Sequence, residues 1–340
     1  DAFDTPGSVQ AGARPDVRGK SVSTVVLRLF RDIFGEIAEI ESDSDFFELG
    51  GDSLMAESLM VAIEQALGVI LSPAVLLEAP TPVKLAEAVE RELGHERPRY
   101  LVSVQEEGYR LPLFCVHGMN GASTFPARIA VVAGRDRPVY AFRAVGLQRG
   151  EIPRTSVEEI AAGYVAELKC VRPTGPYLIF GQCGPAFVAY EMAQQLLRSG
   201  DAVAGLILGD PPVSTGIAWL ARDQATLGAI QAKARKTAEA AAQRARDNPD
   251  LPGPARTNIV GKSILGAVGA YVPRPFPGET LAVCSSRRAG LLTDPRRGLP
   301  SLLPRLTLIR VGRTHDDVFK SNVATTLAAI KAFVDRVSPI

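Results

Sequence analysis

The sequence has few of the residues that build metal sites or disulfide frameworks. It holds 3 histidines and 4 cysteines in 340 residues, and the cysteines are widely spaced and form no C-x-x-C pair. Zinc sites and small disulfide-rich scaffolds both depend on characteristic cysteine spacings, which this chain lacks. We therefore expect neither a bound metal nor a disulfide framework.

The sequence also lacks an excess of charge of either sign and lacks long apolar runs. Its 38 basic and 37 acidic side chains leave a formal net charge of +1, too little to attract nucleic acid or an anionic membrane. No apolar run approaches the roughly 20 residues of a membrane-spanning helix, and the first thirty residues show no signal-peptide pattern. These absences predict a cytoplasmic protein with no nucleic-acid and no membrane partner.

Length and composition predict two domains. At roughly 100 to 200 residues per domain, a chain of 340 residues favours two. Residues 1–20 begin with Asp1 and are rich in glycine, proline and alanine, so we interpret them as a linker remnant of a longer chain. The predicted boundaries are a first domain at 21–93, a polar linker at 94–99 and a second domain at 100–340.

The first domain has the apolar spacing of helices. The i, i+3, i+4, i+7 pattern of one buried helix face is formed by Val22, Val25, Val26, Leu29, Phe30, Ile33, Phe34 and Ile37. The apolar positions of a second helix, beginning at Ser53, are Leu54, Met55, Leu59, Ile63 and Leu67. A short segment at 74–77 and a last helix at 82–93 follow, the latter with inward-facing Leu85, Val89 and Leu93. The pattern predicts an all-α four-helix bundle.

The second domain alternates strand and helix signals. Short apolar runs bounded by turn residues occur at 113–116, 139–142, 177–180, 206–208, 281–284 and 306–311. Helical patterns lie between them, which predicts an α/β fold with a mostly parallel sheet covered on both faces.

One interval of the second domain, about 211–271, contains no convincing strand. It holds a polar, alanine-rich helical stretch at 221–246, followed by a breaker run at 248–254. We predict a helical insertion that serves as an active-site lid, and a plain surface excursion is the alternative.

Ser53 stands at the mouth of the second predicted helix, in Gly50-Gly51-Asp52-Ser53-Leu54. This string resembles the attachment motif of carrier-protein domains, in which the serine hydroxyl receives 4′-phosphopantetheine. Glycines permit close approach of a transferase, and a helix N-terminus offers free N–H groups to a phosphodiester. The alternative is that Ser53 only caps the helix. The helical context and the preceding Phe46 and Phe47 favour the carrier motif.

Cys183 occupies a turn between a predicted strand and a predicted helix, in Gly181-Gln182-Cys183-Gly184-Pro185. The turn resembles the G-x-S-x-G nucleophile elbow of α/β-hydrolases, with cysteine as the nucleophile. Pro185 replaces the second glycine, which the first turn of a helix tolerates. The backbone N–H of Gly184 remains available to an oxyanion hole.

Chain order identifies the partners of Cys183, because these hydrolases run nucleophile, acid, histidine. Asp210 follows the next strand and is the predicted acid. His315 is the predicted base, because His95 lies in the linker and His117 precedes the nucleophile. The second oxyanion donor is expected to be the N–H of Met119, in a loop that His117 shapes. The other cysteines are expected to be small buried hydrophobes: Cys115, Cys170 and Cys284.

Residues 21–93 resemble a thiolation domain, that is, a peptidyl or acyl carrier. Residues 100–337 resemble a type I thioesterase domain of nonribosomal peptide or polyketide synthetases. The resemblance implies that Cys183 takes a finished acyl or peptidyl chain from phosphopantetheine on Ser53 and releases it by cyclisation, transfer or hydrolysis. It also implies a phosphopantetheinyl transferase and upstream synthetase modules, with condensation or adenylation domains, as partners. Three residues after Asp210 would help shape the acyl pocket: Pro211, Pro212 and Trp219.

Two other functions remain open. The domain could pass the chain to an external amine, hydroxyl or second carrier as an acyltransferase. It could also be a non-catalytic carrier fused to a degenerate hydrolase, although a degenerate site is expected to lose its acid or base, and this sequence retains both.

Overall fold

The computed structural model describes residues 22–35, 40–94, 99–122, 124–212, 221, 223–294 and 298–338. The predictions for residues 1–20, Ile37, His95 and Trp219 lie outside this part of the chain. The chain divides into two compact units, residues 1–97 and 98–340.

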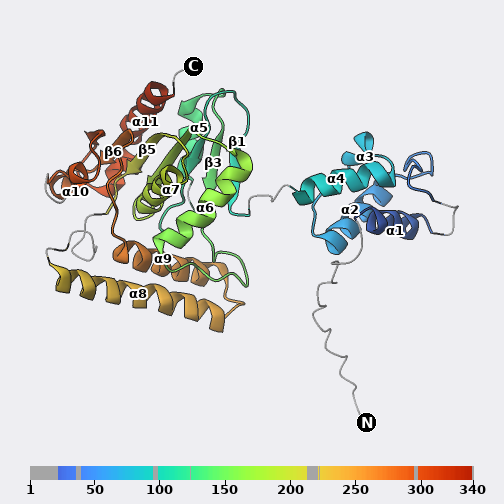
Figure 1. Ribbon diagram of the computed structural model, residues 1–340, viewed down its shortest axis with the longest axis horizontal. Coiled ribbons are helices and arrows are strands. Elements are labelled where there is room, and N and C mark those ends of the chain that lie inside the picture. The colour runs from blue at the N-terminus through green and yellow to red at the C-terminus, as the bar shows by residue number, and fades with distance from the viewer. Residues whose placement is uncertain are drawn as a thin grey trace, which may run out of the picture. The chain divides into compact units, whose positions relative to one another are not determined.

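The first unit is a helical bundle (Figure 1). Its helices are α1 (Val22–Phe34), α2 (Ser53–Leu67), α3 (Val75–Glu78) and α4 (Pro82–Gly94). Its core gathers apolar side chains from all of them, among them Val26, Phe30, Leu59, Ile63, Leu76, Leu85 and Val89. Phe46, from the loop before α2, packs edge-on against Phe30 and Phe34 in this core. The predicted all-α bundle is confirmed.

Leu54 departs from the predicted apolar face of α2. Its side chain is 72% exposed, whereas Ala56, Leu59, Met60 and Ile63 are buried. At about 100° per residue, Leu54 lies roughly 140° around the helix from Leu59, so it cannot share that face. Leu54 is therefore an apolar residue outside the buried face of α2.

The second unit is built on a seven-stranded sheet in the order β1-β3-β2-β4-β5-β6-β7 (Figure 1). The strands are β1 (Leu101–Gln105), β2 (Leu113–Cys115), β3 (Val139–Phe142), β4 (Tyr177–Gln182), β5 (Val203–Gly209), β6 (Thr280–Cys284) and β7 (Leu306–Arg310). All neighbouring pairs are parallel except β1 with β3, which is antiparallel. The sequence did not reveal β1, because this edge strand exposes Val102 and Val104 and has no continuous apolar run.

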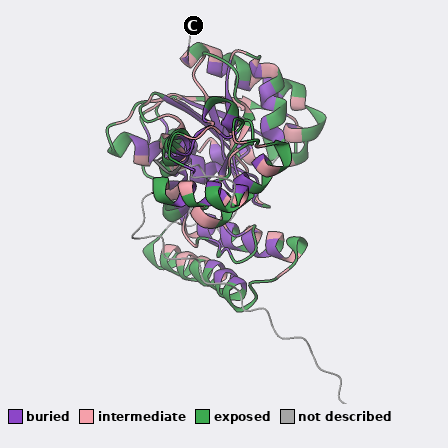
Figure 2. Cartoon of the chain, turned by 90° about the vertical axis from the view of Figure 1, so that its right-hand side faces the viewer, coloured by how far each residue is buried: buried purple, intermediate pink, exposed green. Residues whose placement is uncertain are grey.

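Helices cover both faces of the sheet, as predicted for an α/β fold. One core lies under α6 (Val157–Val171) and α7 (Ala186–Arg198). The other lies under α5 (Phe125–Ala133) and α11 (Val323–Val337). Buried residues, purple in Figure 2, include those of the central strands. Within the described residues, no helix has the length and apolarity to cross a membrane.

In the described part of the interval between β5 and β6, two helices run side by side, α8 (Gln224–Asp247) and α9 (Gly253–Ala270) (Figure 1). The sequence predicted the first but not the second, because glycines at 261, 266 and 269 weaken the helical signal. Gly266 has a packing role: a Cβ there would lie 2.6 Å from the backbone nitrogen of Ala238 in α8. Val260 and Ile264 of α9 join the core under α6 and α7. The α9 half of this interval is therefore part of the folded core and is not a plain surface excursion.

Substitution by alanine should have opposite effects on stability at two glycines of this unit. A Cβ on Gly181, at the end of β4, would lie 2.7 Å from Ala189 Cβ and 2.8 Å from Ala186 Cα, whereas one on Gly228, in exposed α8, would meet nothing within 4 Å. Gly181→Ala should therefore destabilise the second unit by about 1–3 kcal/mol through overpacking. Gly228→Ala should stabilise it by about 0.5–1 kcal/mol through helix propensity. Denaturant unfolding of the two variants beside wild type checks both signs, and equal shifts would contradict the close strand-to-helix approach at Gly181.

Candidate active site

Cys183 lies at a sharp turn between β4 and α7. Its backbone has φ 55°, in the left-handed region that residues other than glycine rarely adopt. The backbone N–H of Cys183 donates to the Gly209 carbonyl oxygen at 2.8 Å, which ties the turn to the neighbouring strand. Pro185 is the N-cap of α7, with an ordinary φ of −62°. The strand, turn and helix predicted around Cys183 are confirmed, and the proline fits without strain.

Asp210 and His315 meet beside Cys183. Asp210 follows β5 directly, and its side chain is fully buried. His315, in the segment after β7, places Nδ1 2.7 Å from Asp210 Oδ2. The same imidazole shares a hydrogen bond with the Cys183 thiol. Three residues separated by up to 132 positions in the sequence (183 to 315) thus form one continuous chain of hydrogen bonds.

Two further residues hold the Asp210 carboxylate, and the sequence analysis missed both. Ser285 donates to Oδ1 from its backbone nitrogen at 2.9 Å and from its hydroxyl at 3.0 Å. Arg288 places a guanidinium nitrogen 3.2 Å from Oδ2 and also donates to the Asp210 main-chain oxygen. Ser285 was detectable, because it follows β6 at the carboxyl edge beside β5. Arg288 lies in the short helix α10 (Ser286–Leu292), where no motif marks it.

These contacts set the charges of the site. Burial by itself would raise the pKa of Cys183, but the hydrogen bond from His315, its charge, the Gly184 N–H and Arg288 together lower it below the usual thiol value. The hydrogen bonds to Asp210 and Cys183 raise the pKa of His315 to about 9, against an opposing effect of burial and of Arg288. Burial would likewise raise the pKa of Asp210, yet its partners hold it below the usual carboxyl range. The arrangement favours a thiolate–imidazolium pair beside a charged carboxylate.

The segment that carries His315 is held by its own hydrogen bonds. The Asp317 carboxylate accepts from the backbone N–H groups of Arg313 at 2.8 Å and Thr314 at 2.9 Å. The Phe319 ring packs edge-on against the His315 imidazole, with centroids 4.9 Å apart. His315 is therefore oriented before any substrate arrives.

Gly184 and Met119, the predicted oxyanion donors, lie next to each other. The Gly184 N–H helps to lower the pKa of the Cys183 thiol, and a Cβ on Gly184 would lie 2.4 Å from the Met119 sulfur. A larger residue at position 184 would therefore have to displace the Met119 side chain, where the loop after β2 (residues 117–121) meets the elbow. The role of both N–H groups in an oxyanion hole remains a prediction.

His117, at the start of that loop, is buried and hydrogen-bonds the Gly118 carbonyl oxygen through Nδ1 at 2.8 Å. Its ring also packs edge-on against Tyr164. Burial lowers the pKa of His117 to about 4, so the imidazole is neutral at physiological pH. These contacts agree with a loop-shaping residue.

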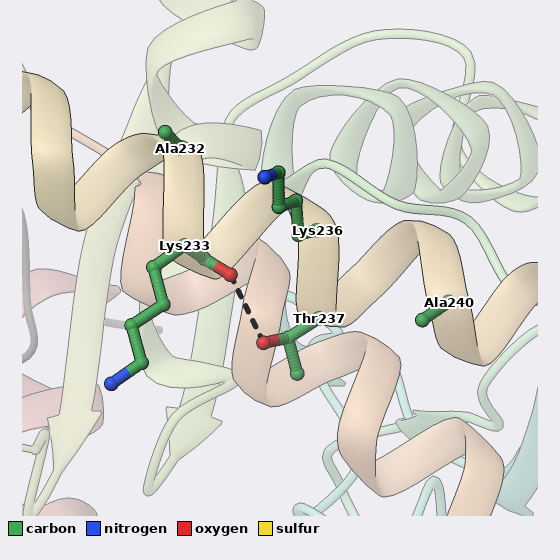
Figure 3. A pocket seen from close by; sticks show the side chains of 5 residues that line it. All are labelled: Ala232, Lys233, Lys236, Thr237 and Ala240. Carbon is green, nitrogen blue, oxygen red and sulfur yellow. Dashed lines mark hydrogen bonds between the residues drawn. The ribbon is translucent and has the colours of Figure 1, made fainter.

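A cavity of about 360 Å³ opens beside the reactive groups. Its lining residues include Met119, Asn120, Thr124, Arg128, Cys183, His315, Phe319 and Lys320. Another hollow, of about 510 Å³, lies on α8 and is lined by Ala232, Lys233, Lys236, Thr237 and Ala240 (Figure 3). It shares no lining residue with the first and contains no nucleophile paired with a base. The cavity at Cys183 is the better candidate for a substrate site.

The other cysteines differ from one another in exposure. Cys115 and Cys284 are buried, as predicted, and burial raises the pKa of Cys284 to about 12. Cys170 is exposed, so its assignment as a buried hydrophobe was wrong. It lies on α6 two positions beyond buried Leu168, on the outward side of the helix. The described residues contain no cluster of three or more histidine, cysteine or acidic side chains suited to a metal ion.

Ser53, in the first unit, is exposed at the first position of α2. The cap of this helix is Asp52, whose carboxylate accepts from the Met55 N–H at 2.9 Å. The alternative that Ser53 merely caps the helix was therefore wrong. Gly51 packs so tightly that a Cβ would lie 2.4 Å from the Phe46 ring, and Gly50 has φ 87°. An exposed hydroxyl at a helix N-terminus fits attachment of a phosphodiester.

Comparison with known families matches both units. A profile of the phosphopantetheine attachment site matches residues 24–89, and a profile of the thioesterase domain matches residues 111–250. The chain is a carrier–thioesterase didomain. The cofactor of such a carrier domain is covalently attached 4′-phosphopantetheine.

The curated relatives are much larger synthetases, and the didomain matches only a small segment of each. It is 37% identical over 198 residues to a dimodular nonribosomal peptide synthase of Bacillus subtilis, covering 57% of this chain and 8% of that protein. It is 36% identical over 180 residues to indigoidine synthase of Streptomyces lavendulae, covering 52% and 14%. Malpinin synthetase of Mortierella alpina is 28% identical over 303 residues, covering 84% of this chain and 4% of that protein. The didomain thus spans a small part of these curated relatives.

Solved structures agree on the fold. A four-domain nonribosomal peptide synthetase bound to AMP and glycine aligns with a TM-score of 0.53 at 23% identity, covering all of this chain and 28% of that one. The NocB thioesterase domain, in covalent complex with a fluorophosphonate nocardicin G analogue, aligns with a TM-score of 0.52 at 23% identity, covering 69% and 99%. The α/β-hydrolase fold predicted for the second domain is confirmed.

The charge state of the pair predicts a reactive Cys183. Because the pKa of Cys183 is lowered while that of His315 is raised to about 9, a larger share of Cys183 is thiolate at neutral pH than in an ordinary cysteine. Iodoacetamide at pH 7 should alkylate Cys183 about tenfold or more faster than exposed Cys170. The difference should narrow as pH rises toward the usual thiol pKa. Peptide mass spectrometry measures both rates in one sample, and equal rates at pH 7 would contradict the ion pair.

Proposed function

We propose that this didomain is the release end of a nonribosomal peptide assembly line. An acyl or peptidyl chain, held as a thioester by the phosphopantetheine attached to Ser53, passes to Cys183 and then leaves the protein. The hydrogen-bonded series Cys183, His315 and Asp210 beside the cavity supports this function most directly. It also weighs against a degenerate, non-catalytic hydrolase, because acid, base and thiol are all in contact.

In the first half of the reaction, Cys183 Sγ attacks the carbonyl carbon of the acyl thioester. Hydrogen bonds from the backbone N–H groups of Gly184 and Met119 would stabilise the developing oxyanion. As the original C–S bond breaks, His315 gives its proton to the departing sulfur, which leaves as a thiol, while Asp210 holds the imidazole through Nδ1. The product is a thioester on Cys183.

In the second half, His315 accepts a proton from the incoming nucleophile as that group attacks the same carbonyl carbon. The bond to Cys183 breaks, and the sulfur leaves as a thiolate. Because the Cys183 intermediate is a thioester, it keeps most of the activation that an oxoester would lose. An activated acyl group favours attack by an amine or by a hydroxyl of the chain itself. We therefore propose release by cyclisation or transfer in preference to hydrolysis.

The remaining features fit this scheme as proposals. The carrier domain occupies residues 21–93 and the thioesterase domain 100–340, with a lid at about 211–271. Pro211 and Pro212 directly follow the buried Asp210, where the lid begins. Upstream synthetase modules supply the acyl chain, and a phosphopantetheinyl transferase modifies Ser53.

Attachment of phosphopantetheine to Ser53 can be tested by measuring the mass of the intact protein. With coenzyme A and a broad-specificity phosphopantetheinyl transferase, the didomain should gain one phosphopantetheine, because the Ser53 hydroxyl is exposed and not used as a cap. Ser53→Ala should gain none. Ser58→Ala is the matched control, since Ser58 lies one turn and a half along α2 and should leave loading intact. Intact-protein mass spectrometry reads all three, and loading of Ser53→Ala would refute the attachment site.

The triad is testable by product release from acyl-loaded protein. His315→Ala and Cys183→Ala should slow release by about 10²–10⁴-fold with folding retained, and Asp210→Asn should also be severe. Cys183→Ser should accumulate acyl-enzyme or shift products toward free acid, because its oxoester is less activated. Cys170→Ser serves as the control thiol and should release normally. Normal release from a folded His315→Ala protein would rule out the assigned base, and chromatography with mass detection quantifies the products.

A further inference from the structure

Arg288 shares the Asp210 carboxylate with His315. The guanidinium lies 3.2 Å from Oδ2, the same oxygen that contacts His315 Nδ1 at 2.7 Å. The Arg288 guanidinium also donates a hydrogen bond to the Asp210 main-chain oxygen, which holds the Arg288 side chain at a second point. The Arg288 N–H also donates to the Ser285 carbonyl oxygen at 3.0 Å, so the backbone on both sides of the carboxylate is tied together. A fully buried carboxylate thus faces two cationic groups at once.

Two cations on one carboxylate oppose each other. A carboxylate beside a histidine stabilises the imidazolium, and a nearby guanidinium reduces that effect by repulsion. Arg288 acts in this direction on His315, lowering its pKa, and it lowers the pKa of Cys183 as well. The Arg288 side chain is 26% exposed, so water screens it only in part.

Other charged groups near His315 contact partners other than Asp210. Asp316 and Lys320, on its own segment, pair with each other at 3.0 Å. Asp317 is held by backbone N–H groups, and Arg128 of α5 donates to the Phe319 carbonyl oxygen at 3.4 Å. Cys284 of β6, near Asp210, keeps its proton because burial raises its pKa to about 12. Arg288 is therefore the charge that most directly balances Asp210.

We infer that Arg288 is a positioning residue whose charge offsets Asp210 so that His315 can act as a base in the second half of the reaction. This inference rests on the proposed function. Once Cys183 carries the acyl group, its sulfur is uncharged and no longer stabilises the imidazolium. His315 must then be unprotonated to take the proton from the incoming amine, hydroxyl or water as the C–S bond breaks and Cys183 leaves as a thiolate. Without Arg288, the Asp210 carboxylate would keep His315 protonated to a higher pH. The positive charge of Arg288 weakens this effect of Asp210 on the imidazole.

The test compares Arg288→Gln, Arg288→Lys and wild type by two pH profiles. The first is the decay of octanoyl-enzyme, formed from the octanoyl thioester of N-acetylcysteamine and followed by intact-protein mass spectrometry. The second is the iodoacetamide alkylation rate of Cys183, with the Cys170 peptide as the internal reference. Arg287→Gln is the matched control, because Arg287 is the exposed neighbour on α10 and its loss removes the same charge.

Arg288→Gln should move the midpoints of both profiles to higher pH by about one unit, because the charge that favours thiolate and disfavours imidazolium is gone. Arg288→Lys should restore most of each shift, and Arg287→Gln should leave both midpoints in place. A merely structural role would lower the plateau rate without raising either midpoint, and would gain nothing from lysine. That result would overturn the inference.

Failure of the proposed function is distinguishable from failure of this inference. Absence of octanoyl on Cys183 in wild type would contradict Cys183 as the nucleophile. Octanoyl on Cys183 with unchanged midpoints in Arg288→Gln would leave the nucleophile intact and overturn the role of Arg288. The alkylation profile needs no acyl chain, so it tests the charge of Arg288 in either case.

Discussion

The hydrogen bond between Asp210 and His315 is the contact on which the candidate site depends. A carboxylate buried as fully as that of Asp210 costs several kcal/mol unless it is paired and hydrogen-bonded. Its partners come from the end of β6, from α10 and from the segment after β7. The need to satisfy one buried charge therefore draws three separate segments to the carboxyl edge of the sheet, and it orients the imidazole toward Cys183.

Backbone strain is concentrated at the same place. In the described part of the chain, the two residues other than glycine with positive φ are Cys183 and Asp210. Such conformations cost of order 1–3 kcal/mol each and persist only where the surroundings enforce them. Here the neighbouring strands enforce them, since Cys183 N–H donates to Gly209 and Asp210 N–H donates to Val283. The central sheet thus supplies the rigidity that holds thiol and carboxylate within reach of His315.

With Cys183 as the nucleophile, as proposed, both domains would hold the acyl chain through the same kind of bond. The cofactor of a carrier domain holds an acyl chain as a thioester, and Cys183 would hold it as a thioester again. Transfer between them changes the energy of the acyl group little, so the barrier is governed by positioning and by the charge of the pair. In the proposed reaction, the chemistry of release would then depend on the second half, where His315 would accept a proton.

The sequence by itself determined the features that arise from local pattern. Helical periodicity predicted the carrier bundle, strand–glycine–helix order predicted the elbow at Cys183, and chain order selected Asp210 and His315. Ser53 was recognisable because a helix mouth after two glycines is a short-range signal.

Only the tertiary structure decided the features that depend on neighbours distant in the chain. Edge strand β1 is defined by pairing with β3, and glycine-rich α9 is held as a helix by packing against α8 and the core. The exposure of Leu54 and Cys170 follows from which side of a helix meets the core. The role of Arg288 could not be predicted from the sequence, because it depends on the distance between Arg288 and Asp210 in space. Only the folded structure, which brings α10 to Asp210, gives that distance.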